Sequence, residues 1–73
     1  MGRIPPLSGR QVIQVLTRAG FRVARQRASH VKLRKGDVIV IVPIHANRPL
    51  KRATMMGIFR DAGLSQQDVL TSL

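Results

Sequence analysis

His30 is the residue of this sequence with the clearest capacity for acid–base chemistry, because cationic side chains flank it on both sides. Arg25 and Arg27 precede it. Lys32 and Arg34 follow at alternate positions, which share a strand face with it. An imidazole can accept or donate a proton near neutral pH, and such a transfer typically contributes about 10² to 10⁴ in rate. The pattern alone also fits an ordinary surface or packing histidine, which is the commoner role.

Other kinds of catalytic site have little support in the sequence. The three acidic residues, Asp37, Asp61 and Asp68, fall in a predicted turn, helix and helix cap, so neither a carboxylate pair nor a two-metal site is indicated. His30 and His45 are far apart and the chain has no cysteine, which argues against zinc. No glycine-rich loop of the phosphate-binding type occurs. We therefore expect no metal and no cofactor.

Positive charge dominates the composition, with thirteen Lys and Arg residues against three Asp and Glu residues and a formal net charge of +10. This balance indicates a polyanionic partner, and arginine, which supplies most of the charge, suits phosphate oxygens. Lys51 and Arg52, at the predicted start of a helix, are further candidates for a phosphate contact. Nucleic acid, a ribosome, an acidic lipid surface and an acidic protein all fit the charge. No predicted helix sets a basic face opposite a strong apolar one, which argues against the lipid surface.

The N-terminal residues contain two prolines and no apolar run of the length that a signal peptide or a membrane span needs. We expect a soluble, cytoplasmic protein in which residues 1–73 form a single domain. A core this small is usually supported by disulfides, a metal or a partner chain, and without cysteine a partner chain is the expected support.

Helix signals appear at three places. Ser8 and Gln11 form the two ends of a capping box, which predicts a helix over residues 9–19 that ends at Gly20. A second helix begins near residues 52–54 and ends before Gly63. Residues 64–69 repeat the capping pattern, with Asp68 in the closing position, and predict a short final helix.

Three strands are predicted between the first two helices. Residues 21–23 alternate as a short, half-buried strand does. Residues 29–35 and 38–42 form a hairpin around Gly36 and Asp37, which sets Lys35 opposite Val38 and His30 opposite Pro43.

This order predicts an α+β fold, in which a three-stranded antiparallel sheet has the helices on one face and a short helix follows at the C-terminus. His30 then shares the other face with the apolar Ile39 and Ile41. Two explanations for these isoleucines are equally supported: the stems of Lys32 and Arg34 cover them, or a protein partner does.

Five segments, in order along nearly the full chain, resemble the HicA family of toxin ribonucleases: Leu7-Ser8-Gly9, Ala19-Gly20-Phe21, Gln26-Arg27-Ala28-Ser29-His30, Val42-Pro43-Ile44-His45 and Ala62-Gly63-Leu64-Ser65. The resemblance implies a fold like the double-stranded-RNA-binding domain, α-β-β-β-α, and an mRNA interferase activity. It also implies that the histidine of a Gly-Ser-His motif, here His30, is the active residue. It further implies a HicB-type antitoxin partner, possible higher-order toxin–antitoxin oligomers and, by our inference, antitoxin contacts at Ile39 and Ile41.

The chain departs from the family motif at two positions. Ala28 stands where the motif has glycine, and if the backbone there has positive φ, alanine costs about 1 kcal/mol. Val31 stands where a second histidine often follows, so His30 has no imidazole neighbour in the sequence.

Two hypotheses follow. The first is a metal-independent ribonuclease that acts on mRNA, with His30 as the single general acid or base and with RNA contacts from Arg25, Arg27, Lys32, Arg34, Lys51 and Arg52. The second is a non-catalytic RNA-binding or ribosome-associated module with the same fold. A third possibility is an adaptor for an acidic protein. With Phe21 and Phe59 as its only aromatic residues, the chain must rely on phosphate and shape contacts rather than base stacking.

Overall fold

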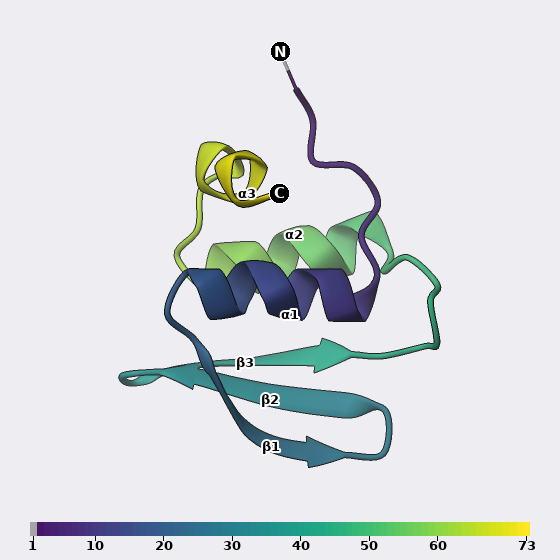
Figure 1. The fold of residues 1–73 in the computed structure, drawn as a ribbon, viewed down its shortest axis with the longest axis vertical. Helices are drawn as coiled ribbons and strands as arrows, with labels where there is room; N and C mark the ends of the chain where they lie inside the picture. The colour runs from purple at the N-terminus through teal and green to yellow at the C-terminus, as the bar shows by residue number, and fades with distance from the viewer. Residues whose placement is uncertain (1) are drawn as a thin grey trace.

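The computed structural model describes residues 2–73. Its three strands form one antiparallel sheet in the order β1-β2-β3. α1 and α2 both contact β3 and lie on the same side of the sheet, with α3 beyond them (Figure 1). The predicted α+β fold, with a short C-terminal helix after the α-β-β-β-α core, is confirmed. The elements in chain order are α1 (Gly9–Arg18), β1 (Arg22–Arg27), β2 (His30–Lys35), β3 (Val38–Pro43), α2 (Arg52–Asp61) and α3 (Gln66–Ser72).

Capping side chains set the start of α1 and α3 as predicted. The Ser8 backbone N–H donates to Gln11 Oε1 at 2.9 Å, and the Ser8 hydroxyl oxygen accepts from the Gln11 backbone N–H at 3.3 Å. α3 has the same reciprocal pair between Ser65 and Asp68. The backbone N–H and the hydroxyl of Ser65 both hold the pKa of the Asp68 carboxyl below its usual value. Gly20 ends α1 with a φ of +103°, so the expected end is also confirmed.

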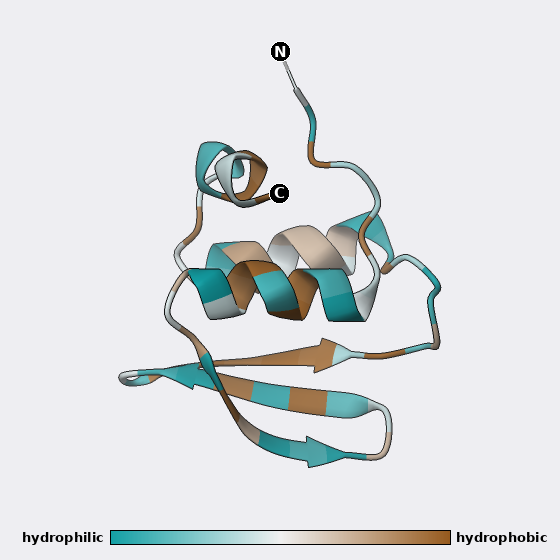
Figure 2. Ribbon diagram, in the orientation of Figure 1, coloured by the Kyte–Doolittle hydropathy of each residue, from teal (hydrophilic) through white to brown (hydrophobic). Residues whose placement is uncertain are grey.

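The β2–β3 hairpin has the predicted register. Lys35 lies opposite Val38, and the pairing continues without interruption to His30 opposite Pro43. The turn glycine, Gly36, has a φ of +60°, a conformation that glycine adopts without strain. β2 alternates between polar and apolar residues, whereas β3 is apolar along most of its length (Figure 2).

The core lies between the helices and one face of β2 and β3. The sheet contributes Val31, Leu33, Val40 and Val42, all buried beneath the helices. The remaining core side chains come from the N-terminal segment, the helices and the residues next to them: Ile4, Leu7, Val12, Val15, Leu16, Phe21, Leu50, Met55, Ile58, Phe59 and Val69. The opposite side of the sheet, which we call the open face, is therefore free of helices.

The first strand differs from its prediction. A half-buried strand was expected over residues 21–23, but β1 runs from Arg22 to Arg27 and is exposed at all six positions. Val23 is 54% exposed, whereas Phe21 is buried just before the strand begins. The reason is that the buried side chains of the sheet belong to β2 and β3, so β1 is an edge strand held mainly by its pairing with β2.

Candidate nucleic-acid interface

A β-bulge in β1 decides which face its arginines occupy. Val23 pairs with Leu33 on the helix side, and two residues later Arg25 pairs with Lys32 on the open face. Strict alternation from Val23 would have placed Arg25 and Arg27 on the helix side. The irregularity between Val23 and Arg25 adds one residue and reverses this facing. As a result Arg25 and Arg27 share the open face with His30.

These residues line a shallow hollow of about 150 Å³, which we call the strand hollow, formed by Arg25, Arg27, His30, Lys32 and Ile41. Arg27 and Pro43 flank His30 from the neighbouring strands, and Arg25 and Ile41 flank Lys32. His30 is exposed, so its ring can meet a ligand from solvent. The structure thus brings together the histidine and three of the cations that the sequence singled out.

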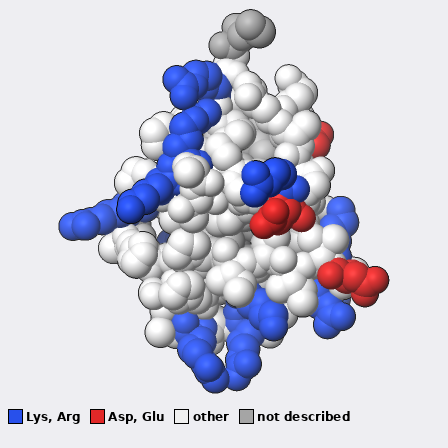
Figure 3. All heavy atoms as spheres, turned by 180° about the vertical axis from the view of Figure 1, so that it is seen from behind, with Lys and Arg blue, Asp and Glu red and all other residues white. Residues whose placement is uncertain are grey.

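The cations of the strand hollow carry no compensating negative charge. The only ion pair within residues 2–73 joins Arg60 and Asp61, at 3.8 Å between Nε and Oδ1. Seen from behind, basic side chains gather at the lower end of the molecule, where the sheet lies, and another group runs down the upper left side of the view (Figure 3). Because like charges repel at close range, an anion bound between them relieves that repulsion.

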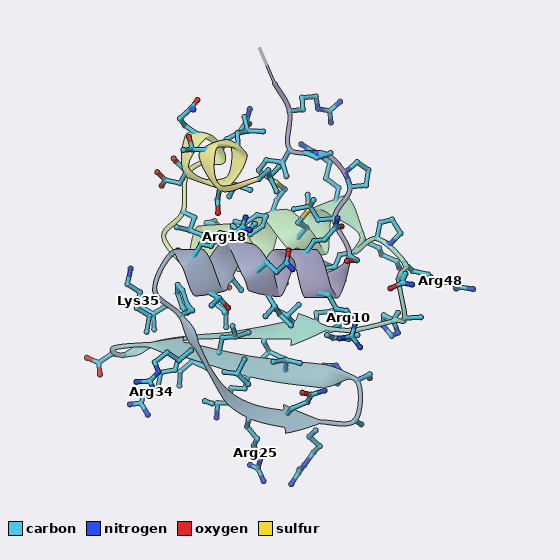
Figure 4. The ribbon with its side chains drawn as sticks, in the orientation of Figure 1. Arg10, Arg18, Arg25, Arg34, Lys35 and Arg48 are labelled. Carbon is cyan, nitrogen blue, oxygen red and sulfur yellow. The ribbon has the colours of Figure 1, made fainter. Side chains whose placement is uncertain are left out.

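The other end of the open face is arranged differently. Arg34 lies opposite Arg22 and Ile39, outside the strand hollow, and its Nε donates to the Gly36 carbonyl at 2.9 Å. Lys35, at the same end but on the helix side of the sheet, donates through Nζ to the Ala19 carbonyl at the end of α1, at 2.7 Å. Both side chains thus bind the protein's own backbone. Figure 4 shows Arg34 beside the β2–β3 turn and Arg25 extending from β1 away from the helices.

The turn that leads into His30 holds Ala28 with a φ of +49°. An L-residue with a side chain is strained in this left-handed region, at a cost of about 1 kcal/mol. The Ser29 carbonyl accepts a hydrogen bond from the Ile44 backbone N–H at 2.7 Å, which ties the turn to the segment after β3. The position where the family motif has glycine therefore does have positive φ.

Lys51 and Arg52 lie apart from the strand hollow. Lys51 lines a larger hollow of about 640 Å³ between the end of β3 and the start of α2, which we call the loop hollow. Arg52 does not line it; its Nη1 donates to the Ile4 carbonyl at 2.8 Å and holds the N-terminal segment on α2. His45 lines the loop hollow and His30 the strand hollow, so neither of these two hollows contains both imidazoles.

Ile39 and Ile41 form an apolar patch on the open face, 46% and 54% exposed. Each lies beside a cationic residue of β2, Arg34 and Lys32 respectively. The stems of those neighbours leave about half of each isoleucine in contact with solvent, so they cover the patch only in part.

Two further findings concern metals and membranes. Among residues 2–73, no three His, Cys, Asp or Glu side chains gather in the way that a metal ion would require. None of the helices that the structure describes combines the length and the apolar composition needed to cross a membrane.

Comparisons with known proteins give a family and a structural neighbour for the chain. The model of a family described as HicA toxin of bacterial toxin–antitoxin systems matches residues 9–64. Among solved structures, a chain from a toxin–antitoxin complex of Streptococcus pneumoniae is similar, with 28% sequence identity and a TM-score of 0.70; the match covers 81% of this chain and 100% of that chain. No match was found among curated proteins. Because the family match spans most of the sequence, the chain belongs to the HicA toxin family.

Proposed function

We propose that the protein is a toxin ribonuclease, an mRNA interferase, that cleaves RNA at the strand hollow. Membership of the HicA family supports the toxin class. The observation that carries the proposal is an exposed imidazole, His30, in a hollow that three cations line and no carboxylate does. Such a site attracts a phosphodiester and offers it a proton-transfer group.

RNA is the proposed substrate because its 2′-hydroxyl can act as an internal nucleophile. In this reaction the 2′-oxygen forms a bond to the adjacent phosphorus, the bond from phosphorus to the 5′-oxygen breaks, and the products are a 2′,3′-cyclic phosphate and a 5′-hydroxyl. His30 takes the proton from the 2′-hydroxyl or gives one to the leaving 5′-oxygen. Water or another group completes the transfer. The reaction as proposed uses no metal.

The cations are proposed to share the phosphates along the RNA. Arg25, Arg27 and Lys32 line the strand hollow with His30 and would stabilise the extra negative charge of the transition state. An outer set would hold neighbouring phosphates. It consists of Arg34, through its terminal N–H groups, and of Lys51 and Arg52.

A second candidate function, a non-catalytic RNA-binding or ribosome-associated module, is favoured by one observation. The strand hollow contains a single imidazole and no carboxylate, so it offers only one conventional acid–base residue. Both functions predict RNA binding that weakens steeply with salt. They differ in the effect that loss of His30 should have on RNA cleavage.

The deciding experiment compares wild type, His30→Ala and the surface control Gln14→Ala on one RNA substrate in the presence of a chelator. We expect the wild type and the control to give products with cyclic phosphate ends. His30→Ala should bind the RNA equally well and cleave it about 10² to 10⁴ times more slowly. Unchanged cleavage by His30→Ala would remove the proposed mechanism. Absence of cleavage by all three, with RNA binding retained, would favour the binding module.

We also propose that a HicB-type antitoxin covers the open face. The similar chain from Streptococcus pneumoniae comes from a toxin–antitoxin complex, and the patch of Ile39 and Ile41 gives this chain an apolar surface next to the strand hollow. Ile39→Lys should weaken antitoxin binding by 2 kcal/mol or more, as at a buried interface hot spot, roughly 30-fold in Kd. Val23→Lys is the matched control, because Val23 is equally apolar and exposed but faces the helix side. Equal effects of the two substitutions in a binding titration would argue against this surface.

A further inference from the structure

We propose that the loop hollow binds one unpaired nucleotide of the RNA, next to the linkage that is cleaved at His30. The base would lie on the apolar floor of the hollow and its phosphate at the cationic rim. This inference rests on the proposed function, because it assigns the RNA a second point of recognition beyond the cleaved phosphate. It makes the protein selective for a nucleotide that is free of base pairing.

The lining of the loop hollow suits a nucleotide. Its apolar lining includes Pro43, Pro49 and the buried Leu50, which offer a surface to the flat face of a base. Arg48 and Lys51 stand at the rim, and no carboxylate belongs to the lining. The volume of about 640 Å³ lies within the range of about 300–1,000 Å³ that is usual for small-molecule and cofactor sites.

Polar groups that could read the edge of a base also line the loop hollow. His45 contributes an imidazole and Thr54 a hydroxyl, and both can donate or accept a hydrogen bond. The first turn of α2 contains no acidic side chain, and its cap residue Lys51 makes no side-chain hydrogen bond to the helix. The partial positive charge of this helix end adds to that of the cations. The lining of the loop hollow therefore suits a ligand that combines a negative charge with a polar ring, as a nucleotide does.

The loop that forms the hollow is fixed at both ends. At its start the Ile44 N–H donates to the Ser29 carbonyl at 2.7 Å. At its end the Leu50 N–H donates to the Leu7 carbonyl at 2.8 Å, and Pro49 forms a bridge with Ser8. A hollow held in this way is shaped before a ligand arrives, which lowers the entropy cost of binding.

The loop hollow adjoins the strand hollow through one residue pair. Pro43 lies directly opposite His30 in the β2–β3 ladder, and paired residues place their side chains on the same face of a sheet. Pro43 also lines the loop hollow. An RNA strand whose phosphate lies at His30 therefore reaches the loop hollow with an adjoining nucleotide. Figure 4 shows Arg48 extending from the loop, at the opposite edge of the molecule from the Arg34 end of the sheet.

Abasic substitution in a short RNA tests this proposal. A set of single-stranded oligonucleotides, each lacking one base at a different position, is titrated against His30→Ala protein so that binding is measured without cleavage. We expect removal of one base, next to the linkage that the wild type cuts, to weaken binding about tenfold, as loss of a well-made polar contact does. Removal of bases elsewhere should have little effect.

Two substitutions in the loop hollow, each made in the His30→Ala protein, test whether the sensitive base binds in that hollow. Arg48→Gln removes a rim charge, and Thr54→Leu fills the hollow without changing the charge; both residues are exposed, so folding should be retained. In each variant, removal of the base at the sensitive position should no longer weaken RNA binding. Arg60→Gln is the matched control for charge, because Arg60 lies at the far end of α2 and pairs with Asp61. It should leave the sensitive position unchanged.

The outcomes separate this inference from the proposed function. If no position is sensitive, or if Arg48→Gln and Arg60→Gln weaken binding equally without altering sensitivity, the nucleotide site is wrong. If Arg48→Gln weakens antitoxin binding and leaves RNA binding intact, the loop hollow belongs to the protein partner and the inference is also wrong. If cleavage survives in His30→Ala while the sensitive base depends on Arg48, the catalytic proposal fails and the nucleotide site stands.

Discussion

At one end of the sheet Arg27 and Lys32 donate no hydrogen bond to any group within residues 2–73, whereas at the other end Arg34, on the open face, and Lys35, on the helix side, each donate to a backbone carbonyl. The residue types and charges are the same. A cation that already satisfies a carbonyl must give up that bond, or share it, before it can bind a phosphate. The local density of positive charge therefore identifies the binding site poorly. Whether each cation is already hydrogen-bonded to the protein identifies it better.

The turns at the two ends of the sheet also differ, in the strain of their backbones. The β2–β3 turn has glycine at its positive φ, Gly36, and is unstrained. The β1–β2 turn has alanine there, Ala28, at a φ of +49°. Strain of this kind is more often found at functional sites than elsewhere. The end that holds the strand hollow is thus also the end with the strained turn.

Among the changes that compare the two ends, the largest expected effect comes from removing both arginines that line the strand hollow. Arg25→Gln with Arg27→Gln should slow single-turnover cleavage about 10² to 10³ times, because two groups that stabilise the transition state are lost. Arg22→Gln with Arg34→Gln changes the net charge equally and should slow it less than about tenfold, since Arg34 already binds Gly36. Equal losses in the two double variants would show that only the total charge matters.

A smaller effect is expected from two lysines, one of which should affect cleavage and the other the free energy of unfolding. Lys32→Gln should slow cleavage about tenfold and leave the free energy of unfolding unchanged or slightly higher, because a repelling charge is removed. Lys35→Gln should lower the free energy of unfolding by about 1 kcal/mol, through loss of the bond to Ala19, and leave cleavage unchanged. Urea titrations and cleavage rates measure both. If Lys35→Gln slows cleavage as much as Lys32→Gln does, the contrast between the two ends is wrong.

The smallest effect is expected at the strained turn. Ala28→Gly should raise the free energy of unfolding by about 0.5–1 kcal/mol, because glycine adopts positive φ without strain. Ala53→Gly, in the exposed first turn of α2, is the control and should lower it by up to about 1 kcal/mol. A thermal or urea denaturation series measures the difference. Two substitutions that destabilise alike would mean that Ala28 stores no strain.

Much of the fold was predictable because its signals are local. The capping box of Ser8 and Gln11 and the turn at Gly36 depend on residues a few positions apart, and the predicted start of α1 and the hairpin register are confirmed. The grouping of Lys32 with His30 followed from alternation along one strand, and the two do line one hollow.

The parts that depend on distant contacts were not predictable. Arg52 resembles any other cation in the sequence, and its bond to the Ile4 carbonyl exists only because the N-terminal segment folds back over α2. The loop hollow is lined by residues between Pro43 and Thr54, but its shape depends on distant contacts, because the bonds to the Ser29 and Leu7 carbonyls hold that loop in place. The extent of β1 was missed because its basic residues show no alternation, and a bulge leaves no mark in such a run.

The bulge in β1 has a consequence for changes in chain length. Ala24 is the unpaired extra residue between two stretches that each keep their own partners, Val23 with Leu33 and Arg25 with Lys32. A chain one residue shorter at this point could form a regular ladder with the same partners and would still present both arginines beside His30. Position 24 is therefore the place where this strand can lose a residue and keep both arginines on the open face, whereas deletion of Gln26 would make Arg25 and Arg27 adjacent and so place them on opposite faces of the sheet.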